Sequence, residues 1–165
     1  MIIGVISDTH MPSRGKTLPK ALVQGLQGVD LILHAGDWTD LSVVAKMEQI
    51  APVDGVAGNN DGYDIVKKFG RSKILSLNGR KIGLIHGEGP YGTAEQRAWN
   101  VYGRAGVDVI IFGHSHIPYC NSIDGVLLFN PGSPTDKRRQ PKYSYGILKL
   151  GEQIEAKHFF YSDKS

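Results

Sequence analysis

Residues 1–10 of the chain read MIIGVISDTH, a short apolar run followed at once by polar side chains. Ile2–Ile6 is rich in β-branched residues, which predicts a buried strand. Asp8 and His10, two residue types that ligate metal ions, come directly after the point at which this strand ends. The same order of strand and polar cluster recurs further along the chain, and this pattern decides the fold that we expect.

Further apolar runs predict four more strands, with helical segments between them. The predicted strands are Leu31–Leu33, Val53–Ala57, Ile82–Ile85 and Val107–Phe112. The predicted helices run from a Thr17 cap to Leu26, from Leu41 to Ile50 after Asp40, and from a Thr93–Gln96 capping box to near Gly106. Apolar strands that alternate with helices are typical of α/β proteins in which most strands pair in parallel.

The last third of the chain changes character, because strands there follow one another with only turns between them. We predict strands at Asn121–Ile123, Val126–Phe129, Tyr143–Leu150 and Gln153–Phe160. Asp124-Gly125 is a strong hairpin signal, and Asn78-Gly79 earlier in the chain is another. Since there is no internal repeat and no linker, we expect residues 1–165 to form a single domain with a mixed C-terminal sheet.

The composition excludes several classes of protein. The chain has 165 residues and a mass of 18.0 kDa, and 19 Lys and Arg against 16 Asp and Glu give a net charge of +3. So small a charge does not argue for nucleic acid or an anionic membrane surface as partner. No apolar run approaches the ~18 residues of a membrane span, and the N-terminus lacks a basic leader. Cys120 is the single cysteine, so no internal disulfide can form, and we expect a buried thiol in a cytoplasmic protein.

Each predicted strand of the first two thirds is followed by residues whose side chains bind metal ions. In chain order these are Asp8 and His10; His34 and Asp37; Asn59, Asn60 and Asp61; His86; and His114 and His116. In open α/β sheets ligands bind beyond the carboxyl ends of the strands, so we expect these side chains to meet at one edge. Nitrogen and oxygen donors without cysteine suit Mn²⁺, Fe, Co²⁺, Ni²⁺ or Zn²⁺ better than Ca²⁺. Even without His34, Asn60 and Asp61, seven candidate ligands remain, which are too many for one open site and about right for two ions that share a carboxylate.

With these blocks in view, the sequence resembles the calcineurin-like metallophosphoesterase family. The family pattern is D-x-H, G-D, G-N-H-[D/E], a later His and G-H-x-H, and the chain carries these blocks in order between residues 8 and 116. The resemblance implies an α/β fold, a four-layer αββα sandwich with two mixed β-sheets. It also implies that Asp8, His10 and His116 hold one metal, that Asn59, His86 and His114 hold a second, and that Asp37 bridges the two.

Two divalent ions ~3.5–4 Å apart can convert a bridging water into a hydroxide nucleophile and neutralise the phosphoryl oxygens. Since the chain also resembles the small bacterial and archaeal phosphodiesterases of the family, the expected function is hydrolysis of an organic phosphate diester by a dinuclear metal-bound hydroxide. Mn²⁺ is the first choice of cofactor. The expected partner is a small-molecule phosphate ester. No membrane partner is expected, and nucleic acid is disfavoured as a partner. The sequence leaves the formation of a homo-oligomer open.

Position 60 departs from the family pattern, because Asn60 stands where many members have the histidine of G-N-H. The resemblance implies that this histidine contacts the phosphate and protonates the leaving group. An amide donates a hydrogen bond but cannot transfer a proton, so Asn60 does not fill that second role. The residues expected to act in catalysis are Asp37, Asn59, Asn60 and Asp61, the last by orienting an imidazole or anchoring its turn.

Two other functions fit the same residues. A phosphomonoesterase would use the same centre, although the missing histidine favours diesters or activated esters. A protein-interaction scaffold similar to the retromer subunit of this family, with residual metal binding, is disfavoured because all seven ligand positions hold competent side chains.

Several more residues stand between a structural and a functional role. His34 is favoured as a packed residue, and the basic segment Lys137–Lys142 as a solvated loop. The turn Asn130–Ser133 could contact phosphate or be a plain turn. Trp38 and Tyr91 could line a cleft or pack over the sheet edge.

Overall fold

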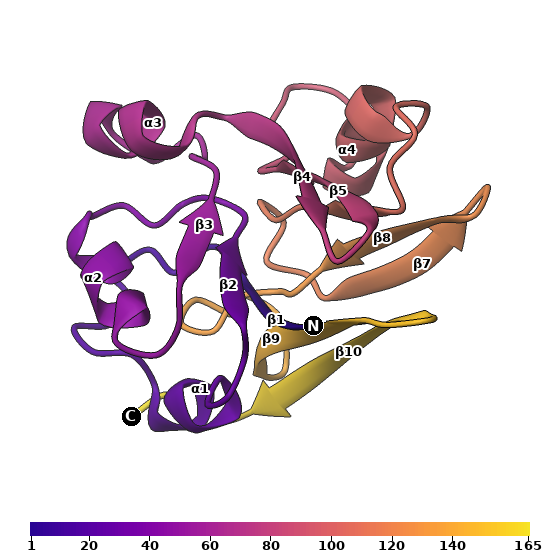
Figure 1. The fold of residues 1–165 in the computed structure, drawn as a ribbon. Coiled ribbons are helices and arrows are strands. Elements are labelled where there is room, and N and C mark those ends of the chain that lie inside the picture. The colour runs from indigo at the N-terminus through magenta and orange to yellow at the C-terminus, as the bar shows by residue number, and fades with distance from the viewer.

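The strands form two five-stranded sheets in the computed structural model, which describes residues 1–165 (Figure 1). The first sheet has the order β10-β9-β1-β2-β3, with β1 (Ile2–Ile6), β2 (Leu31–His34), β3 (Val53–Gly55), β9 (Tyr143–Leu150) and β10 (Ile154–Tyr161). The strands β1, β2 and β3 run parallel, whereas β9 is antiparallel to β1 and β10 is antiparallel to β9. The carboxyl ends of the three parallel strands therefore lie at one edge of this sheet.

The second sheet is mixed in the same way. Its order is β4-β5-β6-β8-β7, with β4 (Ser72–Leu77), β5 (Arg80–Ile85), β6 (Val109–Ile111), β7 (Tyr119–Ile123) and β8 (Val126–Asn130). The central strands are parallel, and the two outer strands join them through antiparallel hairpins. The hairpins turn at Asn78-Gly79 and Asp124-Gly125, where all four residues have positive φ, as type I′ turns require. Both predicted hairpins are confirmed.

Helices cover the outer faces of the two sheets and give the fold four layers (Figure 1). They are α1 (Lys20–Gly25), α2 (Ser42–Glu48), α3 (Tyr63–Phe69) and α4 (Ala94–Tyr102). The first three pack against the outside of the first sheet, and α4 packs alone against the second. This order of layers confirms the αββα sandwich with two mixed sheets.

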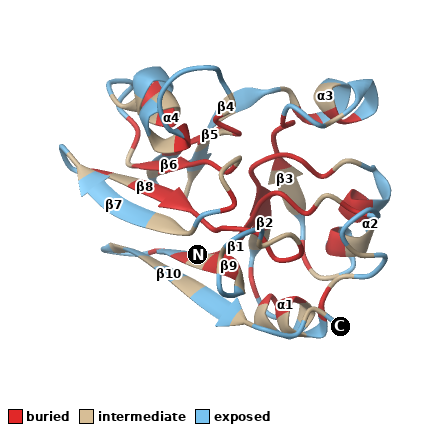
Figure 2. Cartoon of the chain, turned by 180° about the vertical axis from the view of Figure 1, so that it is seen from behind, coloured by how far each residue is buried: buried red, intermediate tan, exposed pale blue.

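Three apolar layers hold the sandwich together, and alternation along the strands supplies them. In β6, Val109 and Ile111 face the core between the sheets, while Ile110 faces α4. In β1, Ile3 faces the same central core, whereas Ile6 faces the helices. Figure 2 shows that burial continues from the strands into the loops that leave β1 and β2. The loops that carry the predicted ligands are therefore part of the packed interior.

The predicted elements are confirmed apart from shifted ends, with one helix that starts later than expected. The capping box of Thr93 and Gln96 is present and begins α4. The first helix begins only at Lys20, and Thr17 does not cap it, so that prediction is wrong. The reason is Pro19, which disfavours helical backbone at the residue before it and stands itself in extended conformation, with ψ 139°.

Two elements were not expected from the sequence, and four strands pair differently from the expectation. In α3 only Ile65 and Phe69 are buried, and β4 is an edge strand that alternates between exposed and half-buried residues. Neither presents the apolar run that a prediction needs. The last four strands form no C-terminal sheet of their own, because β7 and β8 complete the second sheet while β9 and β10 complete the first.

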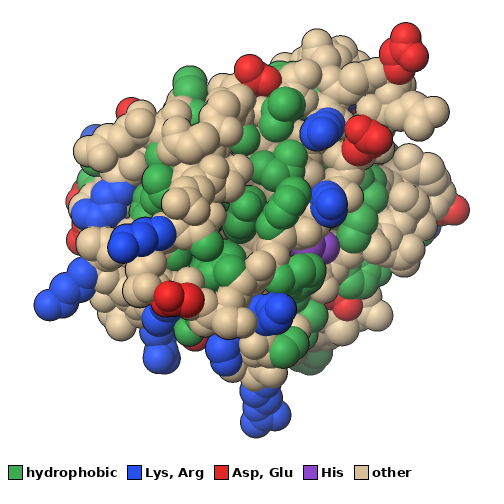
Figure 3. All heavy atoms as spheres, turned by 90° about the horizontal axis from the view of Figure 1, so that it is seen from below, with side chains coloured by type: hydrophobic (Ala, Val, Ile, Leu, Met, Phe, Trp, Pro, Cys, Tyr) green, Lys and Arg blue, Asp and Glu red, His purple; other side chains and the backbone are tan.

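The face of the molecule that includes β10 and α1 shows apolar side chains across its middle, with Lys and Arg side chains among and around them (Figure 3). Phe160 of β10 is about half exposed. Cys120 is also exposed, because it lies on the edge strand β7, so the expectation of a buried thiol is wrong. No helix in the structure combines the length and the apolar character needed to cross a membrane.

Candidate metal centre

Five of the predicted ligands have backbone angles that residues other than glycine rarely adopt. The angle φ is positive at Asp8 (58°), His10 (45°), Asp37 (61°), His114 (72°) and His116 (62°). Such a conformation costs on the order of 1–3 kcal/mol per residue and persists only where the surrounding contacts impose it. Its repeated use in these loops indicates that the loops are shaped to direct their side chains.

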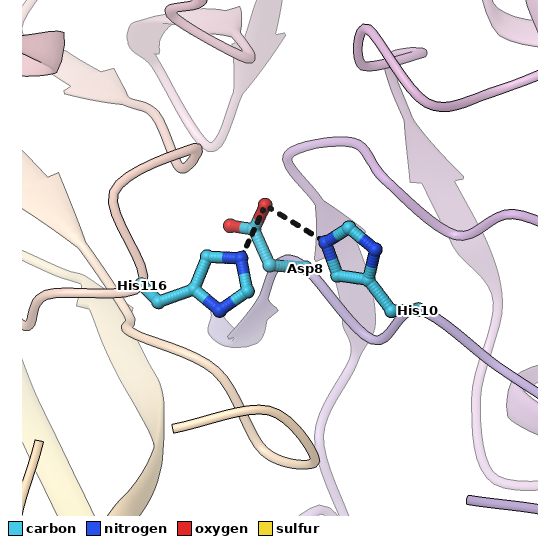
Figure 4. A group of neighbouring side chains, drawn as sticks. All are labelled: Asp8, His10 and His116. Carbon is cyan, nitrogen blue, oxygen red and sulfur yellow. Dashed lines mark ion pairs between the residues drawn. The ribbon is translucent and has the colours of Figure 1, made fainter. Parts of the chain in front are cut away.

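Asp8, at the end of β1, has two oxygens in different surroundings. Its Oδ2 accepts hydrogen bonds from the Ser7 hydroxyl at 2.7 Å and from the His114 backbone N–H at 2.9 Å. Its Oδ1 faces His10 Nε2 at 3.8 Å and His116 Nε2 at 3.5 Å (Figure 4). Asp8 is fully buried. One oxygen is thus satisfied by the protein, and the other faces three imidazole nitrogens, because His86 Nε2 also lies 3.7 Å from Oδ1.

Three buried atoms of this group have no hydrogen-bond partner: Asp8 Oδ1, His10 Nε2 and His116 Nε2. A buried polar atom without a partner costs roughly 1–3 kcal/mol. The ligand atoms lie within 4.8 Å of one another, as do ligands that surround one ion. One carboxylate and two imidazoles are a donor set that fits a divalent transition metal.

Asp37, after β2, lies between this group and a second one. Its Oδ2 is 3.4 Å from His10 Nε2 and 3.2 Å from His86 Nε2. On the far side, His114 Nδ1 lies 3.4 Å from His86 Nε2 and 3.2 Å from Asn59 Oδ1. The structure therefore brings all seven predicted ligands together around Asp37, and Asp8 belongs to both groups that could hold an ion, Asp8-His10-His116 and Asp8-Asp37-His86.

Backbone carbonyls fix the orientation of two of the imidazoles. His86 Nδ1 donates to the Ala35 carbonyl at 2.7 Å, and His116 Nδ1 donates to the Asp136 carbonyl. A carbonyl only accepts hydrogen bonds, so in each neutral ring Nδ1 carries the proton and Nε2 keeps its lone pair. Both Nε2 atoms face the centre, which is the arrangement that metal ligation needs.

Asn60 and Asp61 hold Asp37 and its loop. The backbone N–H of Asn60 donates to Asp37 Oδ1 at 2.9 Å, and its side-chain Nδ2 donates to Asp37 Oδ2 at 2.8 Å. The Asp61 carboxylate accepts the backbone N–H groups of Gly58, Asp37 and Thr39 at 2.7–2.8 Å. Asp61 therefore anchors the two loops that carry Asp37 and Asn59.

The charges of the centre shift the pKa values of Asp37 and His86 in opposite directions. Burial alone would raise the pKa of Asp37, but hydrogen bonds from His86 and Asn60 outweigh burial and hold that pKa below its ordinary value. Burial would lower the pKa of His86, but the hydrogen bond to Asp37 and the charge of Asp8 raise it to about 9. Without metal, the imidazole of His86 is therefore protonated at neutral pH.

Metal loading at about pH 7.5 is expected to release a proton from His86. Ligation needs the neutral ring, and the metal-free pKa of about 9 lies above this pH, so apparent metal affinity should rise as pH increases toward 9. Calorimetric titration in buffers of different ionisation enthalpy measures the number of protons released. His86→Gln should release about one proton fewer than the wild type. An equal number in both proteins would contradict the protonated state of His86.

Gly58 is required by the close approach of Asp37. A Cβ at position 58 would lie 2.3 Å from Asp37 Oδ1 and 2.7 Å from Asp37 N. Gly58→Ala is therefore expected to displace Asp37 and weaken Mn²⁺ binding about 10–100-fold, as the loss of a ligand's supporting contact does. Gly62→Ala in the same loop is the matched control, because a Cβ there meets nothing within 4 Å. Electron paramagnetic resonance of free Mn²⁺ gives both affinities, and equal values would exclude this role for Gly58.

His34 and Trp38 lie behind the centre and pack against each other. Their rings stack with centroids 3.8 Å apart, and both residues are fully buried. His34 Nδ1 accepts from the Gly36 N–H at 3.0 Å, and His34 Nε2 bonds the Thr9 hydroxyl. Burial lowers the pKa of His34 to about 3. The prediction of a packed histidine is confirmed, and Trp38 lines no cleft; Tyr91, in contrast, is largely exposed.

The turn after β8 supports the ligands. Ser133 Oγ donates to the Asp8 carbonyl at 2.8 Å and accepts from the Asp136 N–H at 2.8 Å. Asn130 Nδ2 donates to the Gly113 carbonyl at 3.0 Å, beside the His114 loop. The Pro-Gly-Ser sequence had marked this turn, whereas no sequence signal marked Asp136 as the partner of an imidazole.

Comparisons with known proteins place the chain in a family. The calcineurin-like phosphoesterase superfamily domain matches residues 1–153. The chain is 41% identical over 158 residues to a probable metallophosphoesterase of Methanocaldococcus jannaschii, an alignment that covers 95% of this chain and 80% of the relative. It is 28% identical to a phosphodiesterase of the same archaeon, over 80% of this chain and 83% of that one.

Among solved structures, wild-type Vps29 of Entamoeba histolytica complexed with zinc has a TM-score of 0.77 at 21% identity. The match covers 97% of this chain and 99% of Vps29, and at this identity it shows a shared fold. The family match and the archaeal relative go further, because they extend over the loops that hold every residue of the metal centre. The chain therefore belongs to the calcineurin-like phosphoesterase superfamily.

Proposed function

We propose that this chain is a metal-dependent phosphodiesterase that holds two divalent cations at the centre described above. The first would be held by Asp8, His10 and His116, the second by Asn59, His86 and His114, with Asp37 shared between them. The observation that carries the proposal is the set of three buried ligand atoms that lack a hydrogen-bond partner, which a bound cation would satisfy. Mn²⁺ is the first choice, and Ni²⁺, Zn²⁺, Fe and Co²⁺ are alternatives for nitrogen and oxygen donors.

Bound cations would supply a nucleophile from water at neutral pH and neutralise charge on the phosphoryl oxygens. The chain's own contribution is position and charge. Asp8 and Asp37 bring two negative charges against four from the cations, so the loaded centre keeps a surplus of about +2. This surplus favours an anionic substrate, whatever the small net charge of the whole chain.

The surroundings of Asn60 favour diesters over monoesters. Its amide is engaged by Asp37 and cannot transfer a proton to a departing alkoxide. Hydrolysis of a monoester passes through a loose transition state with charge on the leaving oxygen, so it suffers more from the absence of an acid. The phosphodiesterase relative from Methanocaldococcus jannaschii supports the same choice.

The test compares bis(4-nitrophenyl) phosphate with 4-nitrophenyl phosphate, using metal-free protein and protein loaded with Mn²⁺, Ni²⁺, Zn²⁺ or Mg²⁺. We expect hydrolysis only in the loaded protein and a higher kcat/KM for the diester. A higher kcat/KM for the monoester would replace the proposal with a phosphomonoesterase. Hydrolysis of neither ester with any metal would favour a protein-interaction scaffold. His10→Gln, which removes one of the unpartnered nitrogens, should abolish the metal-dependent rate.

A further inference from the structure

A cluster of cations lies beside the His10 and His116 half of the centre. It comes from three segments that are far apart in the sequence: the loop after β1, the loop before β9 and the last residues of the chain. We define the basic cluster as Arg14, Lys137 and Lys164, which share contacts around Asp136 and Tyr143, together with Arg138, which follows Lys137 in the same loop. The chain as a whole has a net charge of only +3, so this concentration is a local feature.

Neutral groups hold the basic cluster together. Lys164 Nζ donates to the Arg14 carbonyl at 2.7 Å and to the Thr135 carbonyl at 2.9 Å. The Nζ atoms of Lys137 and Lys164 lie 5.8 Å and 5.5 Å from the centre of the Tyr143 ring. Carbonyls and an aromatic face orient these ammonium groups but do not cancel their charge.

Asp136 is the one carboxylate within 4 Å of the basic cluster. Its Oδ2 lies 3.5 Å from Arg14 Nε and 3.9 Å from His116 Nδ1. Asp163 and the C-terminal carboxylate flank Lys164 in the sequence, but neither forms an ion pair with it, so three of the four cations have no ion-pair partner within 4 Å. Like charges held together on a rigid frame repel one another, so a bound anion would stabilise this part of the surface.

The basic cluster is tied directly to the ligand loops. The Arg14 backbone N–H donates to the His10 carbonyl at 2.9 Å, and the Asp136 carbonyl accepts the His116 Nδ1–H. The side chain of Arg14 is 60% exposed, and Arg138 is exposed as well. Both guanidinium groups are therefore open to solvent beside the loops that carry His10 and His116.

Arg97, which lies near His114, differs from the arginines of the basic cluster because backbone carbonyls occupy its guanidinium. Its nitrogens donate to the carbonyls of Gly87, Tyr91 and Gly92 at 2.7–2.9 Å. Arg97 therefore serves the loop after His86, whereas most donors of Arg14 and Arg138 remain free for a ligand.

We propose that the basic cluster binds a second phosphate group of the substrate. The preferred ester would be a phosphodiester whose organic part carries a further phosphate. Three cations without an ion-pair partner match a phosphate with about −1.5 to −2 charges better than a single carboxylate. The proposal takes the reaction at the centre from the proposed function, but its claim concerns binding beside the centre.

The test uses two esters that differ only in the second phosphate. Thymidine 3′-phosphate 5′-(4-nitrophenyl phosphate) and thymidine 5′-(4-nitrophenyl phosphate) release the same 4-nitrophenolate. With Mn²⁺-loaded protein, kcat/KM should be about tenfold higher for the ester with the 3′-phosphate, through charge-assisted contacts. The ratio should shrink as salt shortens the Debye length from ~30 Å at 0.01 M to ~10 Å at 0.1 M.

The double variant Lys137→Gln/Arg138→Gln should lower this ratio to about twofold or less, since two of the four cations are lost. A variant of equal charge, Lys68→Gln/Arg104→Gln on exposed parts of α3 and the turn after α4, should keep the wild-type ratio. Both esters are measured on the same preparation, so poor folding or poor metal loading lowers both rates and leaves their ratio unchanged.

A second measurement needs no activity. Thymidine 3′,5′-bisphosphate added to metal-free protein should shift the backbone amide resonances of the segment Lys137–Lys142 saturably, and the double variant should abolish these shifts. Equal kcat/KM for the two esters in the wild type, or an unchanged ratio in the double variant, would overturn the second-phosphate site. Hydrolysis of neither ester would instead overturn the proposed function, and the amide shifts would then decide the site alone.

Discussion

Asp37→Asn is expected to abolish measurable hydrolysis of bis(4-nitrophenyl) phosphate while the chain stays folded. Asp37 Oδ2 faces both His10 and His86, so the substitution removes a negative charge from the point that two cations would share. Losing several kcal/mol of charge stabilisation lowers the rate by ~10³-fold or more, at ~1.4 kcal/mol per factor of ten. The measurement is kcat/KM at saturating Mn²⁺, together with the metal content of the protein.

Asp40→Asn is the matched control for this change. It removes the same charge nearby, from an exposed carboxylate that accepts the Ser42 N–H at 2.7 Å at the start of α2. Asparagine accepts such a bond about as well, so stability should be unaffected. Elemental analysis should find two Mn²⁺ in the control and at most one in Asp37→Asn. A folded Asp37→Asn protein with a rate near that of the wild type would contradict the shared-ligand assignment.

The loops of the centre could be predicted from the sequence because their information is local. In the first ten residues, a β-branched run and the Asp8 and His10 side chains follow one another without interruption. The predicted strand fixes the position of the loop, and the loop can be identified from neighbouring residues of the sequence alone. The same holds for Gly113 and the two histidines after it, because they follow the apolar run Val107–Phe112 directly.

The contacts that orient the ligands could not be predicted in this way. Ser133 donates to the Asp8 carbonyl across 125 residues of sequence, and His86 donates to the Ala35 carbonyl across 51. Such pairs are set by how two sheets stack, and no periodicity within one segment encodes them. The same limit applies to β9, whose pairing with β1 decides that the C-terminal strands belong to two different sheets.

Position 60 shows how the structure changes the meaning of a sequence feature. In the family pattern, position 60 holds a histidine, which this chain replaces with asparagine. In the structure Asn60 also has a role of its own, because its two hydrogen bonds fix both oxygens of Asp37. The amide therefore helps to place Asp37, and under the proposed function it supplies no proton to a leaving group at this position.

Hydrolysis by the wild type is therefore expected to depend steeply on the quality of the leaving group. Aryl diesters, whose phenolates leave without a proton, should be hydrolysed far faster than alkyl diesters. General acid catalysis is typically worth ~10²–10⁴-fold, and this factor is what the poor leaving groups lose. The measurement is the slope of log kcat/KM against leaving-group pKa across one series of diesters with Mn²⁺-loaded protein.

Asn60→His tests whether position 60 faces the leaving group. Asn60→Ser is the matched control, because it also removes the amide contact with Asp37 but adds no acid. If the new imidazole reaches the leaving oxygen, alkyl diesters should gain up to ~10²–10⁴-fold over the serine variant, while 4-nitrophenyl esters should gain little. The gain should disappear above neutral pH, because an imidazole with an ordinary pKa of ~6.5 then has no proton to give. If the histidine and serine variants, both folded and fully loaded with metal, have the same slope, then position 60 acts only through Asp37. The absence of a histidine there would then leave the chemistry of the leaving group unchanged.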